Sequence, residues 1–189
     1  MRRAYSLPDH AQSPFPLIQT PRLNLRELVA GDAAAIFAIH SDADAMRWFG
    51  CDTMADLAAA SQLIKIFASW RTMPNPGTRW GIEYQGQIVG SCGLFKWDKN
   101  AKHCHIGYEL AQSHWGMGLM REALLAILAW GFEHMALNRI QAQVHPQNSA
   151  SIKSLESLGF VQEGCFREAG FWHGQHHDLL QYALLKRDW

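Results

Sequence analysis

The sequence predicts an α/β fold of the α+β type, in which a mixed, largely antiparallel sheet carries helices on its faces. The 189 residues suit one domain with a sizeable core, and 48% of them are hydrophobic. The segments follow the order strand, helices, strand run, helix, strand, helix and strand pair. This mixed order favours antiparallel pairing over the strict alternation of parallel α/β folds.

Period-two patterns predict the strands, and period-3.6 patterns predict the helices. Asp32 is expected to cap an Ala-rich helix, and Gln85-Gly86 is expected to turn a hairpin. The expected strands are 23–28, 80–84, 87–97, 103–110, 139–145, 161–171 and 179–185; the expected helices are 32–40, one within 52–70, 117–135 and one after Asn148.

The last predicted helix has clear signals at both ends. Asn148 is its candidate N-cap. Ile152, Leu155 and Leu158 form an apolar stripe, and Gly159 fits the left-handed position that follows a helix. The stripe should therefore face the core.

The first twenty residues contain three of the seven prolines and are interpreted as an N-terminal arm (1–20) ahead of the domain (21–189). No apolar leader follows the first charged residues, and no segment has the roughly 18 consecutive apolar residues of a membrane span. The four cysteines are widely spaced, which favours reduced thiols and a cytoplasmic location.

The charge balance argues against two classes of partner. Lys+Arg and Asp+Glu both number 17, so no global basic excess points to nucleic acid or to an acidic membrane. The eight tryptophans fit a large core, a ligand groove or a subunit interface. A homodimer is plausible if some of them are exposed.

Two glycines separate a predicted strand from a long apolar helix, in residues 113–124. The first N–H groups of a helix lack intrahelical partners and lie at the positive end of its dipole. Gly116 and Gly118 would let main chain approach a phosphate closely. A tight turn without a ligand is the alternative interpretation.

Four motifs, in order, resemble the GNAT acetyltransferase superfamily and, within it, the RimJ/RimL-type N-acetyltransferases. They are residues 106–110 (IGYEL), 115–123 (WGMGLMREA), 148–151 (NSAS) and 158–160 (LGF). The opening TPRLNLR (20–26) and the late Asp178 and Tyr182 are also similar to that branch. The resemblance covers about residues 20–186.

The resemblance implies the GNAT fold, in which strands 103–110 and 139–145 splay apart around acyl-CoA. The main chain of the loop would bind the coenzyme A pyrophosphate, Asn148 would lie near the pantetheine arm, and the Leu110 N–H would donate to the oxyanion. The loop residues implied are Trp115, Gly116, Met117, Gly118, Leu119 and Met120.

The chain departs from the family pattern at several positions. Trp115 and Met120 occupy the ends of the loop motif, and Met117 replaces a common basic or polar residue. Many GNAT enzymes place a tyrosine acid where this chain has Leu155. A tyrosine acid at that position is therefore absent.

Two residues are candidates for catalysis. Glu109 is the leading base, acting directly or through water; its alternative is a solvated or salt-bridged strand residue. Ser151 is the candidate acid for the leaving thiolate, by similarity to RimL-like members; its alternative is helix capping. Both alternatives remain open on the sequence.

The histidines do not form a convincing metal motif. In a strand, Cys104 faces away from His103 and His105, so no metal is expected. His173, His176 and His177 are expected in a hairpin turn. Trp172 and His173 are expected beside the acceptor, with much of the groove supplied by residues 40–70; packing explains Trp172 equally well.

The implied function is acetyl-CoA-dependent transfer to a primary amine, such as the N-terminal α-amino group of a ribosomal protein. Small amines, amino acids and amine antibiotics remain open as acceptors, and so does another acyl-CoA donor. A non-catalytic acyl-CoA sensor or interaction module on the same fold is the alternative from a different functional class.

Overall fold

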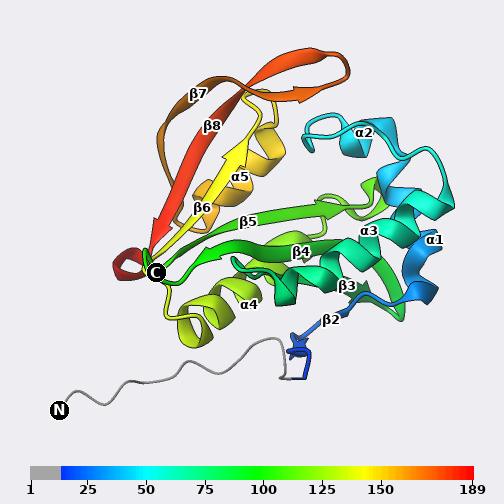
Figure 1. Ribbon diagram of the computed structural model, residues 1–189, viewed down its shortest axis with the longest axis horizontal. Helices are drawn as coiled ribbons and strands as arrows, with labels where there is room; N and C mark the ends of the chain where they lie inside the picture. The colour runs from blue at the N-terminus through cyan, green and yellow to red at the C-terminus, as the bar shows by residue number, and fades with distance from the viewer. Residues whose placement is uncertain (1–13) are drawn as a thin grey trace.

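A computed structural model describes residues 14–189, and within them eight strands form one sheet in the order β1-β2-β3-β4-β5-β6-β8-β7 (Figure 1). Every neighbouring pair is antiparallel except β5–β6. The strands are β1 (Ile18–Gln19), β2 (Leu23–Glu27), β3 (Thr78–Tyr84), β4 (Gln87–Asp98), β5 (His103–Leu110), β6 (Arg139–Val144), β7 (Val161–Trp172) and β8 (Gln175–Leu185). The α-helices are α1 (Ala33–His40), α2 (Ala43–Met46), α3 (Leu57–Ser69), α4 (Leu119–His134) and α5 (Ser149–Ser157).

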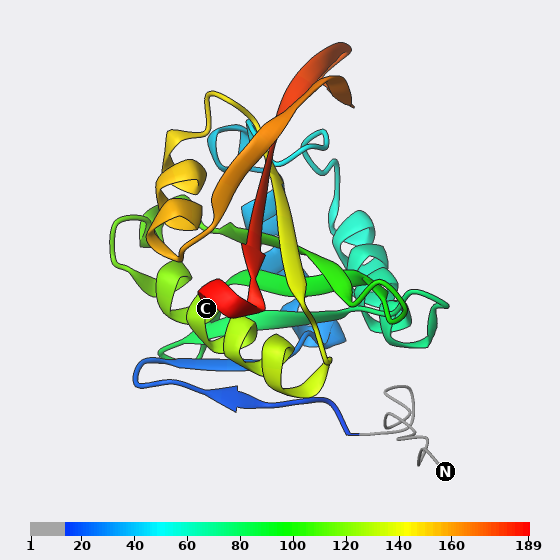
Figure 2. The same ribbon diagram turned by 90° about the vertical axis from the view of Figure 1, so that its left-hand side faces the viewer.

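Helices cover both faces of the sheet (Figure 2). Apolar residues of α4 pack on Trp80, Ile82 and Leu94 in the main core. A smaller core joins α1 and α3 to Ile88 of β4. Because successive strand residues face opposite sides, Arg79 lies on the α3 side while Trp80 lies on the α4 side.

The only parallel pair in the described sheet separates after three residues. β5 and β6 pair from His103 with Arg139 to His105 with Gln141. Residues 106–110 of β5 continue in register with β4, whereas residues 142–144 of β6 continue with β8. The two strands therefore splay apart, and each leaves one edge facing a gap.

Local predictions hold for most elements and differ at three places. Asp32 does stand at the start of α1, but its carboxylate accepts from Val29 N and Arg26 instead of capping the helix. β8 begins at Gln175, so His176 and His177 lie on the strand and not in the turn. The α2 helix has no counterpart in the sequence prediction.

Part of the predicted arm lies against the domain. Trp80 Nε1 donates to Pro16 O at 2.7 Å, and the Phe15 ring meets Trp80 edge-on at 6.1 Å. β1 then adds an outer strand to the sheet. Residues 14–17 and β1 thus extend the packed unit, while residues 1–13 lie outside the described chain. Within the described part, the helices are too short or too polar to span a membrane.

Candidate active site

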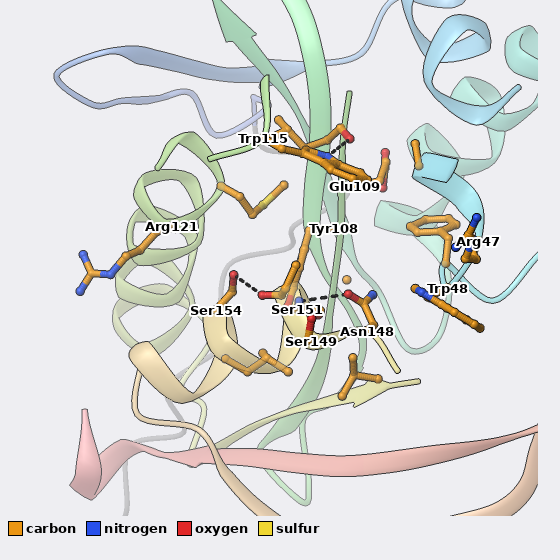
Figure 3. A pocket seen from close by; sticks show the side chains of 18 of the residues that line it. Arg47, Trp48, Tyr108, Glu109, Trp115, Arg121, Asn148, Ser149, Ser151 and Ser154 are labelled. Atoms are coloured by element: carbon orange, nitrogen blue, oxygen red, sulfur yellow. Dashed lines mark hydrogen bonds between the residues drawn. The ribbon is translucent and has the colours of Figure 1, made fainter. Parts of the chain in front are cut away.

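A cavity of about 740 Å³ occupies the gap between β5 and β6. Its walls come from five parts of the chain: residues 44–49 around α2, residues 106–110 of β5, the 112–121 loop and helix start, residues 142–144 of β6, and residues 147–155, which include most of α5. Figure 3 shows side chains of β5 and α5 meeting in this space, while Arg121 points outward from α4 at its edge. The strand splay therefore creates the site.

The glycine loop predicted from the sequence borders this cavity. Gly116 and Gly118 have φ of 74° and 75°, a conformation that disfavours other residues. Gly118 is the N-cap of α4, so the free N–H groups of the first helical turn begin beside the cavity. A Cβ on Gly116 would meet open space, so its conformation, and not crowding, requires glycine there.

The loop side chains have different surroundings. Trp115 Nε1 donates to Leu110 O at 2.9 Å, which ties the loop to the end of β5. Met117 is 41% exposed, whereas Leu119 is fully buried in the core. Met120 is partly buried and packs against the same core. Leu119 and Met120 can thus serve a ligand mainly through their main chain.

The Leu110 N–H points away from β4. Ala111 N donates to Val89 O at 2.8 Å, and antiparallel bonding alternates along a strand. Leu110 lies opposite Gly90 in the non-bonded pair of that ladder. Its N–H therefore faces the edge at which β5 separates from β6.

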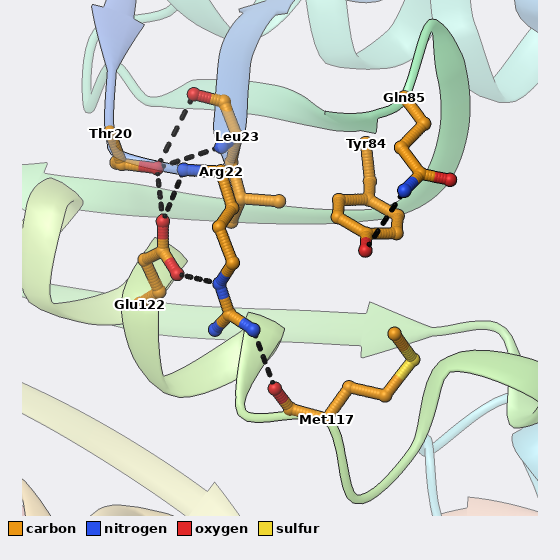
Figure 4. A network of polar contacts seen from close by, with 7 residues as sticks. All are labelled: Thr20, Arg22, Leu23, Tyr84, Gln85, Met117 and Glu122. Atoms are coloured by element: carbon orange, nitrogen blue, oxygen red, sulfur yellow. Dashed lines mark hydrogen bonds and ion pairs between the residues drawn. The ribbon is translucent and has the colours of Figure 1, made fainter.

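An ion-pair brace behind the loop was not foreseen (Figure 4). Glu122 accepts from the Thr20 hydroxyl at 2.6 Å and from Arg22 Nε at 2.6 Å. Arg22 Nη1 donates to Met117 O at 2.9 Å. These contacts cross about one hundred residues of sequence, so no local pattern could reveal them. They connect the turn between β1 and β2 to the loop and to the first turn of α4.

Arg121 is a second residue that sequence reasoning missed. It lies in the first turn of α4, lines the cavity and is exposed. Met117 offers no charge to a phosphate, but this guanidinium lies four residues further along. Its position in the WGMGLMREA motif was the available signal.

Glu109 is buried in a charged network on the α1/α3 face of the sheet. Its carboxylate accepts from Arg79 Nη2 and from the Ser91 hydroxyl. Arg79 also donates to Ser91 Oγ at 2.7 Å and to Gly107 O at 2.9 Å. Glu109 still lines the cavity, although it is only 5% exposed.

His40 completes this network at the end of α1. Its Nε2 lies 3.5 Å from Glu109 Oε1 without a hydrogen bond. Burial, aided by the charge of Arg79, lowers the pKa of His40 to about 4. Burial also lowers the pKa of Arg79 to about 10. The network therefore combines a neutral imidazole with a carboxylate–guanidinium pair.

Ser151 lies on the other side of β5, and its hydroxyl does not cap α5. Asn148 Oδ1 is the cap, because it accepts from Ser151 N at 3.1 Å. The Ser151 hydroxyl instead lies 2.7 Å from the Tyr108 hydroxyl. All three residues line the cavity (Figure 3). Leu155, at the usual tyrosine position, is 1% exposed, as its stripe predicted.

Arg47, Trp48 and Phe49 line the end of the cavity away from the glycine loop, which is called the far end. Trp48 stacks on His145 with 4.0 Å between ring centroids. Trp172 does not line the cavity; it is buried and donates through Nε1 to Arg47 O at 3.2 Å. The β7–β8 hairpin, which carries Trp172, thus packs behind the segment that contains Arg47 and Trp48.

His105 and His173 lie beside polar partners, whereas the buried Nδ1 of His103 has no hydrogen-bond partner. Gln141 Nε2 lies 3.0 Å from His105 Nε2, and Cys104 faces the opposite, buried side. The His173 N–H donates to Asp52 Oδ1 at 2.7 Å. Among the described residues, no cluster of three His, Cys, Asp or Glu side chains could hold a metal.

Three comparisons relate this chain to known proteins. Residues 22–161 match the sequence profile of the acetyltransferase (GNAT) domain. The uncharacterized N-acetyltransferase YoaA of Bacillus subtilis is 33% identical over 174 residues, 91% of this chain and 98% of that protein. The ribosomal protein uS5 alanine N-acetyltransferase of Escherichia coli is 33% identical over 104 residues, 54% of each chain.

A solved structure gives the same fold. A RimL ribosomal α-N-protein acetyltransferase in complex with coenzyme A superposes with a TM-score of 0.80 at 20% identity. The superposition covers 90% of this chain and 98% of that chain. At this identity the likeness concerns the fold alone.

Proposed function

Because the chain belongs to the GNAT family of N-acetyltransferases, as its motifs predicted, we propose that it transfers the acetyl group of acetyl-CoA to the N-terminal α-amino group of a protein. The observation that carries the proposal is the splay of β5 from β6 beside the glycine loop. One cavity then holds an anion cradle at the start of α4 and a catalytic strand edge.

The cradle fits the pyrophosphate of coenzyme A. Positive φ at Gly116 and Gly118 turns the main chain toward the start of α4, where unpaired N–H groups and the helix dipole favour an anion. Arg121 supplies a cation from the same turn. Asn148 holds the facing end of α5 and borders the path of the pantetheine arm.

Acetyl transfer to an amine needs a proton acceptor, an oxyanion donor and support for the departing thiolate. Glu109 supplies negative charge toward the amine, directly or through water. The Leu110 N–H faces the gap as the oxyanion donor. Ser151 faces the cavity from α5 on the thiolate side.

The acceptor is proposed from the relatives and from the far wall of the cavity. The Escherichia coli relative acts, by its name, on an alanine of a ribosomal protein. Trp48 and Phe49 form an aromatic wall beside Glu109, which suits a short apolar residue that carries an ammonium group. The open rim formed by Asp44 and Arg47 leaves room for the chain to continue.

The test is acetyl-CoA turnover with three acceptors: a short peptide with a free Ala N-terminus, the same peptide with a blocked N-terminus and an internal lysine, and a small aliphatic amine. We expect thiol release and an acetylated product with the free peptide only. Turnover with the small amine only would show that the acceptor is a small molecule and not a protein N-terminus. No turnover with any amine would leave a non-catalytic acyl-CoA binder.

The cradle is tested separately by charge. Met117→Glu places a carboxylate beside the main-chain N–H groups, and Met117→Gln is its neutral match. We expect the KM for acetyl-CoA to rise about tenfold for the Glu variant, and to change little for Gln. Equal KM values for acetyl-CoA in the two variants would show that the pyrophosphate does not bind at this loop.

A further inference from the structure

Tyr108 is a cavity residue to which neither the sequence nor the fold comparison assigns a role. It precedes Glu109 on β5, so its side chain faces the opposite side of the sheet. Its hydroxyl lies 2.7 Å from Ser151 Oγ and borders the same cavity. The missing family tyrosine at Leu155 lies one turn further along α5.

We propose that Tyr108 orients the Ser151 hydroxyl as a hydrogen-bond donor to the departing coenzyme A thiolate. The inference rests on the proposed acetyl transfer. Tyr108 is a positioning residue in this arrangement, and Ser151 is the group that meets sulfur. The pair supplies, from two different elements, the donor that Leu155 cannot supply.

The hydrogen-bond inventory supports this division. Each hydroxyl carries one proton, and one proton is used in the bond between the two oxygens. The other proton is left for the cavity. Asn148 already accepts the Ser151 N–H, so the Ser151 hydroxyl is not needed as a cap. When Tyr108 donates to Ser151 Oγ, the Ser151 proton points outward.

The acidities decide between donating a hydrogen bond and transferring a proton. Burial raises the pKa of Tyr108 to about 12, only partly offset by its bond to Ser151. A free thiol has a pKa of about 8.5, so moving a proton from the pair to the thiolate is unfavourable by a factor of about 10³. The pair therefore stabilises the developing charge and keeps both protons.

The step balances without proton release from the pair. The acceptor nitrogen forms the new N–C bond, and the C–S bond breaks with its electron pair passing to sulfur. The amine proton goes to the Glu109 side, directly or through water. The thiolate accepts the Ser151 hydrogen bond and takes its own proton later from solvent.

The test combines Tyr108→Phe, Ser151→Ala and the double variant, with Tyr182→Phe as the matched control. Tyr182 is also buried and bonds Glu156 of α5, but lies outside the cavity. We expect kcat to fall about tenfold for Tyr108→Phe and more for Ser151→Ala, with the KM for acetyl-CoA unchanged. The double variant should match Ser151→Ala alone, because the two residues act as one unit.

The selenoester analogue of acetyl-CoA separates this role from structural support. Its selenolate is a weaker base and needs less stabilisation, so both variants should approach the native rate with it. Equal defects with both donors, additive losses, or an unchanged kcat in Tyr108→Phe would overturn the inference alone. If Tyr108→Phe does not fold, comparing the two acyl donors on Ser151→Ala still decides whether the hydroxyl stabilises the leaving group. A native protein that acetylates no amine would overturn the proposed function and the inference together.

Discussion

Two adjacent residues of β5, Tyr108 and Glu109, lie on opposite faces of the sheet and in different electrostatic surroundings. Glu109 faces α1 and α3 and lies in a buried network of Arg79, Ser91 and His40. Tyr108 faces α5 and meets the neutral hydroxyl of Ser151. Around these two residues, formal charge thus lies on the Glu109 face, and neutral hydroxyls lie on the Tyr108 face.

This difference matches the charges that acetyl transfer creates. The incoming amine is largely protonated at neutral pH and must lose a proton, which favours a nearby carboxylate. The departing sulfur becomes negative, which favours a donor and disfavours a carboxylate. A period-two strand at the splay presents both environments to one cavity.

The largest expected effect is at Glu109. Glu109→Gln should lower kcat about 100-fold or more, with little change in the KM for acetyl-CoA. It should also lower the free energy of unfolding by about 3 kcal/mol, because Arg79 stays buried without its anion. Steady-state kinetics and chemical denaturation measure the two effects.

The control for this variant is Glu83→Gln. Glu83 pairs with Arg26 on a neighbouring strand and lies outside the cavity. Its kcat should remain native. A Glu109→Gln enzyme with native kcat would reduce Glu109 to a structural ion-pair residue.

The charged face should also make stability sensitive to pH. His40 has a pKa of about 4 in the folded protein and an ordinary value of 6.5 unfolded. The unfolded chain therefore binds more protons between these values. The stabilisation is complete above the unfolded pKa and is lost as the pH falls toward 4, by about 3 kcal/mol in total.

Denaturation curves across this window check the assignment. His40→Gln should flatten the pH dependence, leaving the contributions of His105, whose pKa burial also lowers to about 4, and of His145, whose pKa burial lowers as well. Tyr108 should contribute nothing to the pH dependence of stability in this range, because the pKa of its hydroxyl lies far above it. An identical slope in native protein and His40→Gln would contradict the account of the charged face.

A smaller effect is expected at the acceptor wall. Trp48→Ala removes the indole that stacks on His145 and lines the far end of the cavity. The KM for the peptide acceptor should rise about tenfold, with the KM for acetyl-CoA unchanged. Trp48→Phe should recover part of the loss. If Trp48→Ala changed the KM for acetyl-CoA and left the KM for the peptide unchanged, the Trp48 end of the cavity would bind acetyl-CoA and not the acceptor.

The smallest effect is expected at the brace behind the loop. Arg22→Met breaks the contacts to Glu122 and Met117 while keeping the aliphatic stem. Because the Arg22 side chain is 42% exposed, solvent weakens the ion pair and the KM for acetyl-CoA should rise only about threefold. High salt should reduce the difference in the KM for acetyl-CoA between Arg22→Met and the native protein, because salt screens the ion pair. A large fall in kcat would place the brace in the catalytic step.

Local patterns predicted the parts of the site that adjacent residues encode. The two glycines, the Asn148 cap and the Leu155 stripe each follow from neighbours in sequence. The splay itself was expected only through the family resemblance. Its cause is a change of partners, since β5 keeps β4 while β6 keeps β8.

The contacts that distinguish the two faces could not be predicted in this way. Arg79 and Glu109 are 30 residues apart, and Tyr108 and Ser151 are 43 apart. Arg79 sits in the buried first part of β3, next to Trp80, which is a weak signal that a partner must exist. Which anion neutralises it depends on sheet register, and no local pattern encodes that register.

The pH dependence of single-turnover acetyl transfer tests the two-face account most directly. Native enzyme, Glu109→Gln and Tyr108→Phe would be compared with one peptide acceptor from about pH 6.5 to about pH 9.5, a range that spans the amine pKa. The Glu109→Gln defect should shrink as the pH rises and the free amine becomes available, while the Tyr108→Phe defect should stay constant. A constant Glu109→Gln defect, or a Tyr108→Phe defect that varies with pH, would contradict the assignment of charge to one face and neutral donors to the other.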